Sequence, residues 1–124
     1  MKKILVIEDD NILQSAISTA LKDAGFSTVQ SFDGVDGLKK AKKNNINLIL
    51  LDLLMPKKDG WEVLKMLKKD NKTKNIPVFV LTVYEGENSI SKCLSLGAKG
   101  YFIKSKYSLD EIIKNIKNEI GKAK

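Results

Sequence analysis

The sequence contains no histidine, no arginine and only one cysteine among its 124 residues. The absence of histidine excludes a histidine general base, a histidine-ligated metal site and a phosphohistidine carried by this chain. A single cysteine excludes an intrachain disulfide and suits a reducing compartment. No apolar run approaches the roughly 18 residues of a membrane-spanning helix, and the run after Met1 is too short for a signal peptide. We therefore expect a cytoplasmic protein that does not engage a membrane.

The charge balance is strongly basic, with a net charge of +7 and a pI of about 9.4. Basic chains often bind nucleic acid, but all 22 basic residues here are lysines and they are scattered along the chain. Arginine is the usual side chain for bidentate contacts with guanine and phosphate. We interpret the lysines as a solvated surface and expect no direct contact with nucleic acid. The length and the 43% hydrophobic content indicate one globular domain over residues 1–124.

Apolar residues recur with two alternating periods, which is typical of strands alternating with helices. Buried strands are predicted at residues 4–7, 47–51, 77–81 and 100–103, and a shorter strand within residues 26–32. Helices are predicted at residues 11–24, 35–43, 87–96 and 109–120, and from near Asp59 to about Lys69. Short connections between these elements favour an α/β fold with a parallel sheet.

Local signals mark where several of these helices begin and end. Asp10 or Asn11 is suited to cap the first helix, Gly25 ends it, and Ser108 with Glu111 has the spacing of a capping box. The apolar stripe of the first helix is predicted to contain Ile12, Leu13, Ala16, Ile17, Ala20, Leu21 and Ala24. In the fourth helix, one face is predicted to carry Ile90, Cys93 and Leu94.

Polar residues follow the predicted strands at the edge where open α/β sheets bind ligands. The first strand leads into Glu8, Asp9 and Asp10, whereas the later strands lead into Asp52, Thr82 and Lys104. Asp52 is flanked by apolar residues on both sides, and a carboxylate in such surroundings needs a partner or a cation. The structural alternatives are a helix-capping acid at Asp52, an ordinary salt bridge to Lys104 and a turn residue at Thr82.

Two carboxylates without histidine or cysteine favour Mg²⁺, with Mn²⁺ as an alternative. The ammonium of Lys104 can neutralise phosphoryl oxygens, and the hydroxyl of Thr82 can donate to them. Asp52 can then act as the nucleophile and form an acyl phosphate. Neither a Walker A loop nor a GxGxxG motif is present to hold a nucleotide.

Four segments together resemble the receiver domain of two-component response regulators, the fold of the chemotaxis response regulator. They are residues 4–10, residues 52–60, Leu81–Thr82 and residues 97–104, and the resemblance extends over residues 2–121. It implies a flavodoxin-like (βα)5 fold, with a five-stranded parallel sheet in the order 2-1-3-4-5 and helices on both faces. It also implies a signalling switch that catalyses its own phosphorylation rather than a metabolic enzyme.

The resemblance implies a role for each matching residue. Asp52 would be the phosphoacceptor, and the metal ligands would be Glu8 (through water), Asp9, Asp52 and the carbonyl of Leu54. Lys104 and Thr82 would hold the phosphoryl oxygens, and Thr82 would act with Tyr101 as the switch. The phosphodonor would be a histidine kinase or histidine phosphotransferase docking near the first helix and residues 105–107. An unknown downstream protein would bind the surface of the fourth helix, fifth strand and fifth helix.

The chain departs from the family pattern at three places. Ser105 follows Lys104 where the family usually has a proline with a cis bond, so the peptide is either trans or a cis bond that costs about 3 kcal/mol. Val83 is larger than the residue usual after Thr82, which narrows access to the site. Leu54 and Tyr84 lie two residues after Asp52 and Thr82, where they would shield the hydrolytic water. We therefore predict slow autodephosphorylation.

Other functions remain open on the sequence alone. The preferred hypothesis is a stand-alone receiver that is switched by phosphorylation. The chain could instead be the receiver part of a DNA-binding regulator without its effector domain, or a pseudo-receiver that works without phosphorylation. A flavin-binding protein of the same architecture is a further alternative, because a fold does not fix a function.

Overall fold

The computed structural model describes residues 1–43, 45–55, 59–83 and 86–121. The strands are β1 (Lys3–Ile7), β2 (Ser27–Ser31), β3 (Leu48–Asp52), β4 (Val78–Thr82) and β5 (Gly100–Ile103). The helices are α1 (Asn11–Asp23), α2 (Gly34–Lys43), α3 (Gly60–Lys69), α4 (Glu87–Ser95) and α5 (Leu109–Ile120). The strands pair in parallel in the order β2-β1-β3-β4-β5, as the resemblance implied.

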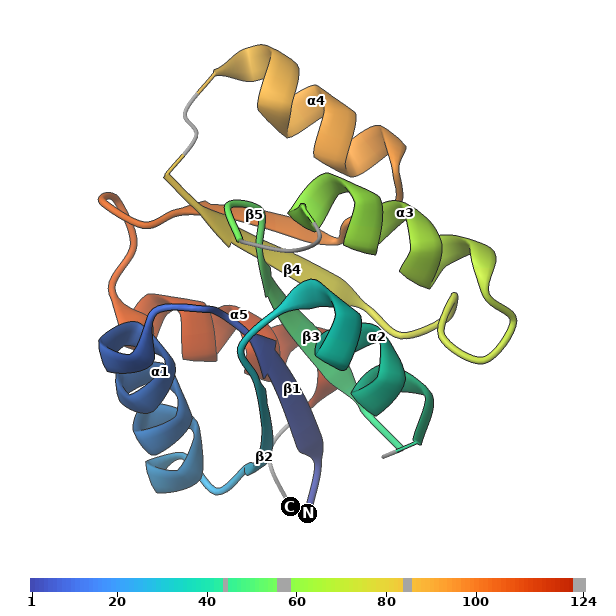
Figure 1. Ribbon diagram of the computed structural model, residues 1–124. Helices are drawn as coiled ribbons and strands as arrows, with labels where there is room; N and C mark the ends of the chain where they lie inside the picture. The colour runs from blue at the N-terminus through green and yellow to red at the C-terminus, as the bar shows by residue number, and fades with distance from the viewer. Residues whose placement is uncertain (44, 56–58, 84–85, 122–124) are drawn as a thin grey trace.

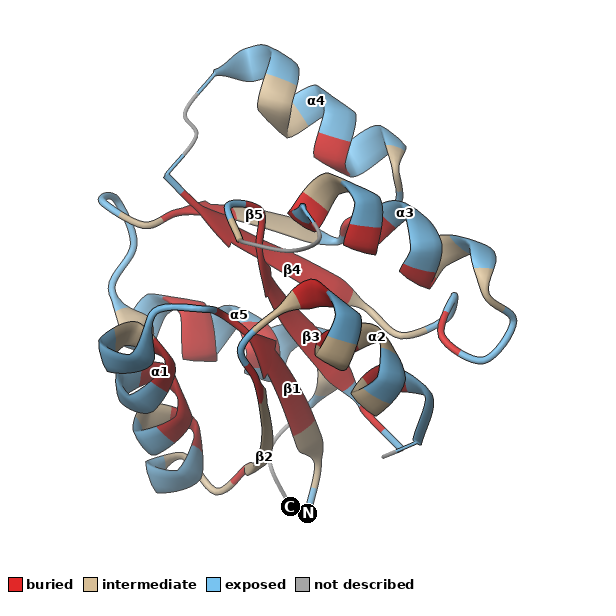
Figure 2. Ribbon diagram, viewed as in Figure 1, coloured by how far each residue is buried: buried red, intermediate tan, exposed pale blue. Residues whose placement is uncertain are grey.

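The sheet lies between two layers of helices (Figure 1). Alternate residues of each strand point to opposite faces, so the strands contribute to two separate cores. On one face, Val6 and Leu50 pack with residues of α1 and α5 such as Ile17 and Ile116. The other core contains residues such as Leu51 from β3 and residues of α2, α3 and α4. Strands β3 and β4 are buried along their whole length (Figure 2).

The helix boundaries follow the predicted capping signals. The side chain of Asp10 accepts a hydrogen bond from Leu13 N–H and caps α1, and Gly25 follows that helix with a φ of 95° that glycine tolerates best. Ser108 and Glu111 form the predicted capping box of α5. In the described part of the chain, no helix combines the length and apolar character needed to cross a bilayer.

Two details of the predicted apolar faces are wrong. Ile12 and Ala16 are exposed on α1, with 82% of Ile12 accessible, and Leu94 on α4 is 50% exposed while its neighbour Cys93 is buried. A helix that covers the sheet with one side has a narrower buried stripe than its apolar residues suggest. Cys93 packs in the second core, and burial raises the pKa of its thiol to about 11.

Gly60 allows α3 to begin directly against the end of β3. A Cβ atom at this position would lie 2.3 Å from the Cα of Leu53 and 2.6 Å from the carbonyl oxygen of Asp52. The N–H of Gly60 also donates to the carbonyl of Leu53 at 3.0 Å. The absence of a side chain therefore sets how closely the helix approaches the residues that follow β3.

Candidate functional site

Three carboxylates meet at the carboxyl ends of β1 and β3. These strands are neighbours in register, with Ile7 opposite Leu51, so the residues that follow on β1 face the end of β3. Oxygen atoms of Glu8, Asp9 and Asp52 all lie within 4.8 Å of one another. Glu8 and Asp52 are almost fully buried, with 2% and 4% exposure, while Asp9 is exposed.

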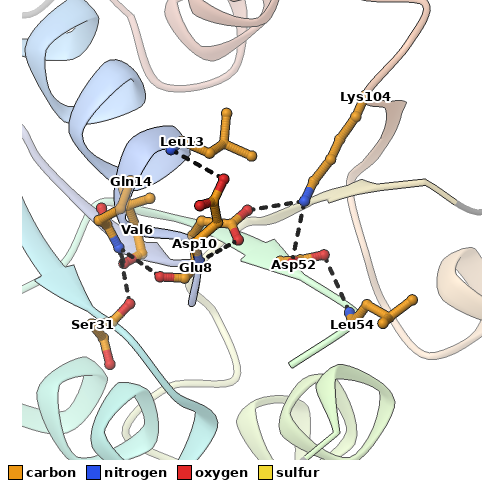
Figure 3. A network of polar contacts seen from close by, with 9 residues as sticks. All are labelled: Val6, Glu8, Asp10, Leu13, Gln14, Ser31, Asp52, Leu54 and Lys104. Carbon is orange, nitrogen blue, oxygen red and sulfur yellow. Dashed lines mark hydrogen bonds and ion pairs between the residues drawn. The ribbon is translucent and has the colours of Figure 1, made fainter. Parts of the chain in front are cut away.

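Lys104 brings a positive charge to this cluster from the end of β5. Its Nζ lies 3.1 Å from Oε1 of Glu8 and 3.3 Å from Oδ2 of Asp52 (Figure 3). Its backbone N–H donates to the carbonyl of Thr82 at 2.8 Å, which holds the end of β5 beside the end of β4. The sheet order therefore places the ammonium group against the buried pair of acids.

Backbone N–H groups also orient the two buried carboxylates. Leu54 N–H donates to Oδ1 of Asp52 at 3.2 Å, and Asp10 N–H donates to Oε2 of Glu8 at 3.1 Å (Figure 3). Both donors lie two residues after the acid that they contact, so each carboxylate accepts a local hydrogen bond from its own backbone segment. These bonds leave the other oxygen of each acid facing Lys104.

The cluster carries more negative than positive charge among the described residues. Burial, and after it the nearby Asp52, raise the pKa of Glu8 to about 7 against the opposing effects of the Asp10 N–H and of Lys104. Burial also raises the pKa of Asp52, although Lys104 and the Leu54 N–H oppose the shift. Burial alone would lower the pKa of Lys104, but the two carboxylates raise it overall. Lys104 is therefore charged at neutral pH, and its ammonium contacts the two buried acids, Glu8 and Asp52.

The donor atoms suit a small divalent cation. The carboxylate oxygens are hard ligands, which Mg²⁺ and Mn²⁺ prefer in the absence of histidine and cysteine. Oε1 of Glu8 is buried and accepts no hydrogen bond, although it lies in ion-pair distance of Lys104. A divalent cation would balance the excess charge of Glu8, Asp9 and Asp52. The residues present therefore fit such an ion.

The other predicted site residues lie around this cluster. Thr82 is fully buried at the end of β4, and Tyr101 on β5 is half-buried and packs against the core under α3 and α4. The side chain of Leu54 is 51% exposed. Tyr84 and residues 56–58 of the matching motif lie outside the described residues.

Two departures from the family pattern have a visible outcome. The described residues contain no cis peptide bond, so the Lys104–Ser105 peptide is trans. The side chain of Val83 is 56% exposed. The predicted place of Lys104 therefore does not depend on a proline after it.

Sequence reasoning missed two features of the site. It paired Lys104 with Asp52 only, whereas the shorter of the two contacts is with Glu8. It also passed over Gln14, which is fully buried and donates to the carbonyl of Glu8. Its spacing could have shown that Gln14 is buried, because it lies three residues before Ile17 and seven before Leu21 on the buried face of α1.

Known proteins share the sequence pattern and the fold of this chain. The family model of the response regulator receiver domain matches residues 4–117. The DNA-binding dual master transcriptional regulator RpaA of Synechocystis is 32% identical over 94% of this chain and 48% of its own length. The chain thus spans about half the length of the first curated relatives that it matches.

Solved structures show the same architecture. The receiver domain of the Francisella response regulator 1452 is 32% identical, with a TM-score of 0.90 over 98% of this chain and 97% of that chain. The response regulator Rcp1, solved in an Mn²⁺-bound form, is 31% identical, with a TM-score of 0.81 over 95% of this chain and 93% of its own. The match of sequence and fold establishes that this chain belongs to the response regulator receiver domain family.

Proposed function

We propose that this receiver accepts a phosphoryl group on Asp52 from a phosphohistidine of a partner kinase or phosphotransferase, in a reaction that requires Mg²⁺ or Mn²⁺. The observation that carries the proposal is the buried Asp52 carboxylate held by Lys104 and the Leu54 N–H beside two further acids. Family membership supports the reaction class, and the acid cluster supports the need for a cation.

The chemistry is an in-line displacement at phosphorus. An oxygen of the Asp52 carboxylate forms a bond to phosphorus while the bond from phosphorus to the histidine nitrogen breaks, so that nitrogen keeps the electron pair. The other ring nitrogen of the phosphohistidine carries a proton during the transfer, so the products are an aspartyl phosphate and a neutral imidazole on the donor. Lys104 would neutralise charge on the phosphoryl oxygens, and Thr82 at the end of β4 would donate its hydroxyl to them. Positioning and charge neutralisation supply most of the catalysis in such a transfer.

The cation would be held by Asp9 and Asp52 directly, by Glu8 through water and by the carbonyl of Leu54. When bound, it supplies positive charge next to the transferred phosphoryl group. The buried Oε1 of Glu8, which accepts no hydrogen bond, and the clustering of three acids support this ligand set. Because the cation offsets the repulsion between the acids, it also favours the ionised form of Asp52 that must attack.

Phosphorylation would shift an equilibrium between two conformations of the receiver. Thr82 moving toward the phosphoryl group leaves space for Tyr101 to turn inward, which changes the surface of α4, β5 and α5 that the downstream protein reads. The phosphodonor would dock at the active-site edge, near α1 and residues 105–107.

A second candidate output follows from the longer relatives. RpaA is DNA-binding and about twice as long as the matched region, so the same chemistry would serve a receiver joined to a DNA-binding region. The two candidate functions share the phosphorylation site and differ only in whether a separate protein or a linked DNA-binding region responds to phosphorylation. The length of the parent open reading frame distinguishes them.

The experiment is intact-mass measurement after incubation with Mg²⁺ and a small acyl phosphate. We expect the wild type to gain the mass of one phosphoryl group, the gain to be lost in alkali, and Asp52→Asn to gain nothing. Asp23→Asn is the matched control, since it makes the same change at an exposed residue at the end of α1. Undiminished labelling of Asp52→Asn would refute the assignment, and omission of Mg²⁺ should abolish labelling of the wild type.

A further inference from the structure

Gln14 is a buried amide on the face of α1 that packs against the sheet. Its side chain is fully inaccessible, and its neighbours on the same helical face are Ile17 and Leu21. A buried polar group among apolar residues is costly unless its hydrogen-bonding groups are satisfied. The partners of this amide therefore indicate what the residue does.

The amide nitrogen of Gln14 lies within hydrogen-bond distance of three backbone carbonyls, so one of its two hydrogens is shared between two acceptors. Nε2 lies 3.0 Å from the oxygen of Val6, 3.2 Å from that of Glu8 and 2.9 Å from that of Ser31 (Figure 3). Its Oε1 accepts a hydrogen bond from the hydroxyl of Ser18 at 3.1 Å. One side chain thus connects α1 to the carboxyl ends of β1 and β2.

The contact with Glu8 falls just beyond the regular strand. Strand β1 ends at Ile7, so the carbonyl of Glu8 lies past the sheet ladder. The N–H of Glu8 donates to the carbonyl of Ser31 at 3.0 Å, and Gln14 donates to that same carbonyl. Gln14 and Ser31 therefore hold the backbone of Glu8 through both its N–H and its carbonyl.

The carbonyl of Glu8 belongs to the peptide that joins it to Asp9. Because a peptide unit is planar, fixing this carbonyl also fixes the N–H of Asp9 and the Cα atoms of both residues. Glu8 and Asp9 are two of the three acids whose oxygens lie within 4.8 Å of one another. The side chains of both therefore start from a backbone that Gln14 holds in place.

We propose that Gln14 is a positioning residue for the acid cluster, acting through the carbonyl of Glu8 to set the relative placement of Glu8, Asp9 and Asp52. Its consequence for cation affinity and phosphorylation rests on the proposed function. Gln14 itself touches neither the carboxylates nor Lys104 in the contacts that the described residues make.

The test compares Gln14→Met with Ser18→Ala. Methionine keeps the length and shape of glutamine without its amide. Ser18 is also buried on α1 and bonds to both Gln14 and Gln30, but none of its hydrogen bonds reaches Glu8. A purely structural role in this network predicts similar effects of the two substitutions. A positioning role predicts that only the change at Gln14 affects the acids.

Two measurements are made on each folded protein: the Mg²⁺ affinity by calorimetry, and the amide NMR signals of Asp9 and Asp10 without metal. We expect Gln14→Met to weaken Mg²⁺ binding by about 10- to 100-fold, the range found when an outer-shell partner of metal ligands is lost. We also expect it to shift or broaden both amide signals. Ser18→Ala should match the wild type in both measurements.

Each outcome decides the proposal. Equal Mg²⁺ affinity and unchanged amide signals in Gln14→Met would overturn it, as would equal losses in both variants. If the wild type binds no Mg²⁺, the proposed function fails, and the metal-free signals of Asp9 and Asp10 still support or overturn the positioning role. Should Gln14→Met not fold, Gln14→Asn retracts the amide by one methylene and is expected to give the same pattern.

Discussion

The buried Glu8 side chain should make the metal-free protein less stable as the pH rises. Its pKa is about 7 in the folded protein and 4.5 ordinarily. Between these values the folded state keeps a proton on Glu8 that the unfolded chain has released. The free energy of unfolding therefore falls as the pH rises through this window, because the folded state binds more protons than the unfolded state. Glu8→Gln mimics the protonated acid and should remove this part of the pH dependence.

The size of the effect follows from the two pKa values. The difference between 4.5 and about 7, at about 1.4 kcal/mol for each pKa unit, gives about 3 kcal/mol. Glu8→Gln should thus raise the free energy of unfolding by about 3 kcal/mol near pH 8 and by less than about 1 kcal/mol near pH 5. The Lys104 contact at 3.1 Å is already part of this balance, because it opposes the rise in pKa.

The assay is urea unfolding of both proteins across this pH range with a chelator present. Glu119→Gln is the matched control, because it removes the same charge from an exposed position on α5. Parallel pH curves for the wild type and Glu8→Gln, or a Glu8→Gln protein less stable than the wild type near pH 8, would refute the reasoning. Added Mg²⁺ should stabilise the wild type more than Glu8→Gln at high pH, because the cation favours the ionised acid.

Two further predictions concern the residues that follow Asp52. Gly60→Ala should destabilise the protein by about 3 kcal/mol, because the new Cβ would lie 2.3 Å from backbone. Gly86→Ala, where the Cβ meets open space at the N-cap of α4, should cost about 1 kcal/mol or less. Urea unfolding measures both losses, and equal losses would contradict the close approach at Gly60. Leu54→Asn should speed the decay of phosphorylated Asp52 by about tenfold, or 1.4 kcal/mol of barrier, because an amide can orient water where the exposed leucine cannot. Intact-mass measurement over time gives the decay rate, and an unchanged rate in Leu54→Asn would contradict the predicted shielding.

Much of the fold could be predicted because local signals and tertiary structure agree. The short apolar runs became the strands, with β5 at its predicted bounds of residues 100–103, and the capping signals at Asp10 and Ser108 are confirmed. The errors lie on helix faces such as Ile12 and Leu94, which the sheet does not cover. Periodicity shows which residues are apolar, but the packing partner decides how wide a stripe is buried.

The sequence predicted which residues gather at the candidate site better than it predicted how they pair. The acids, the hydroxyl and the lysine at the strand ends were sufficient to predict that Asp52 and Lys104 lie together, because parallel strands bring their carboxyl ends to one edge of the sheet. The sequence did not predict that Glu8 is the more tightly paired partner of Lys104. That pairing depends on the register of β1 against β3 and on the place of β5, which no local pattern encodes.

The sequence by itself determined the alternation of strands and helices and the acidic, hydroxyl and lysine residues that follow the strands. The tertiary structure alone decided that Glu8 is buried while Asp9 is exposed, and that Gln14 holds the backbone between them. The physical reason is that side-chain identity is local, whereas burial and hydrogen-bond partners depend on segments brought together from distant parts of the chain. The raised pKa of Glu8 depends on both, since it needs a carboxylate and a site that excludes water.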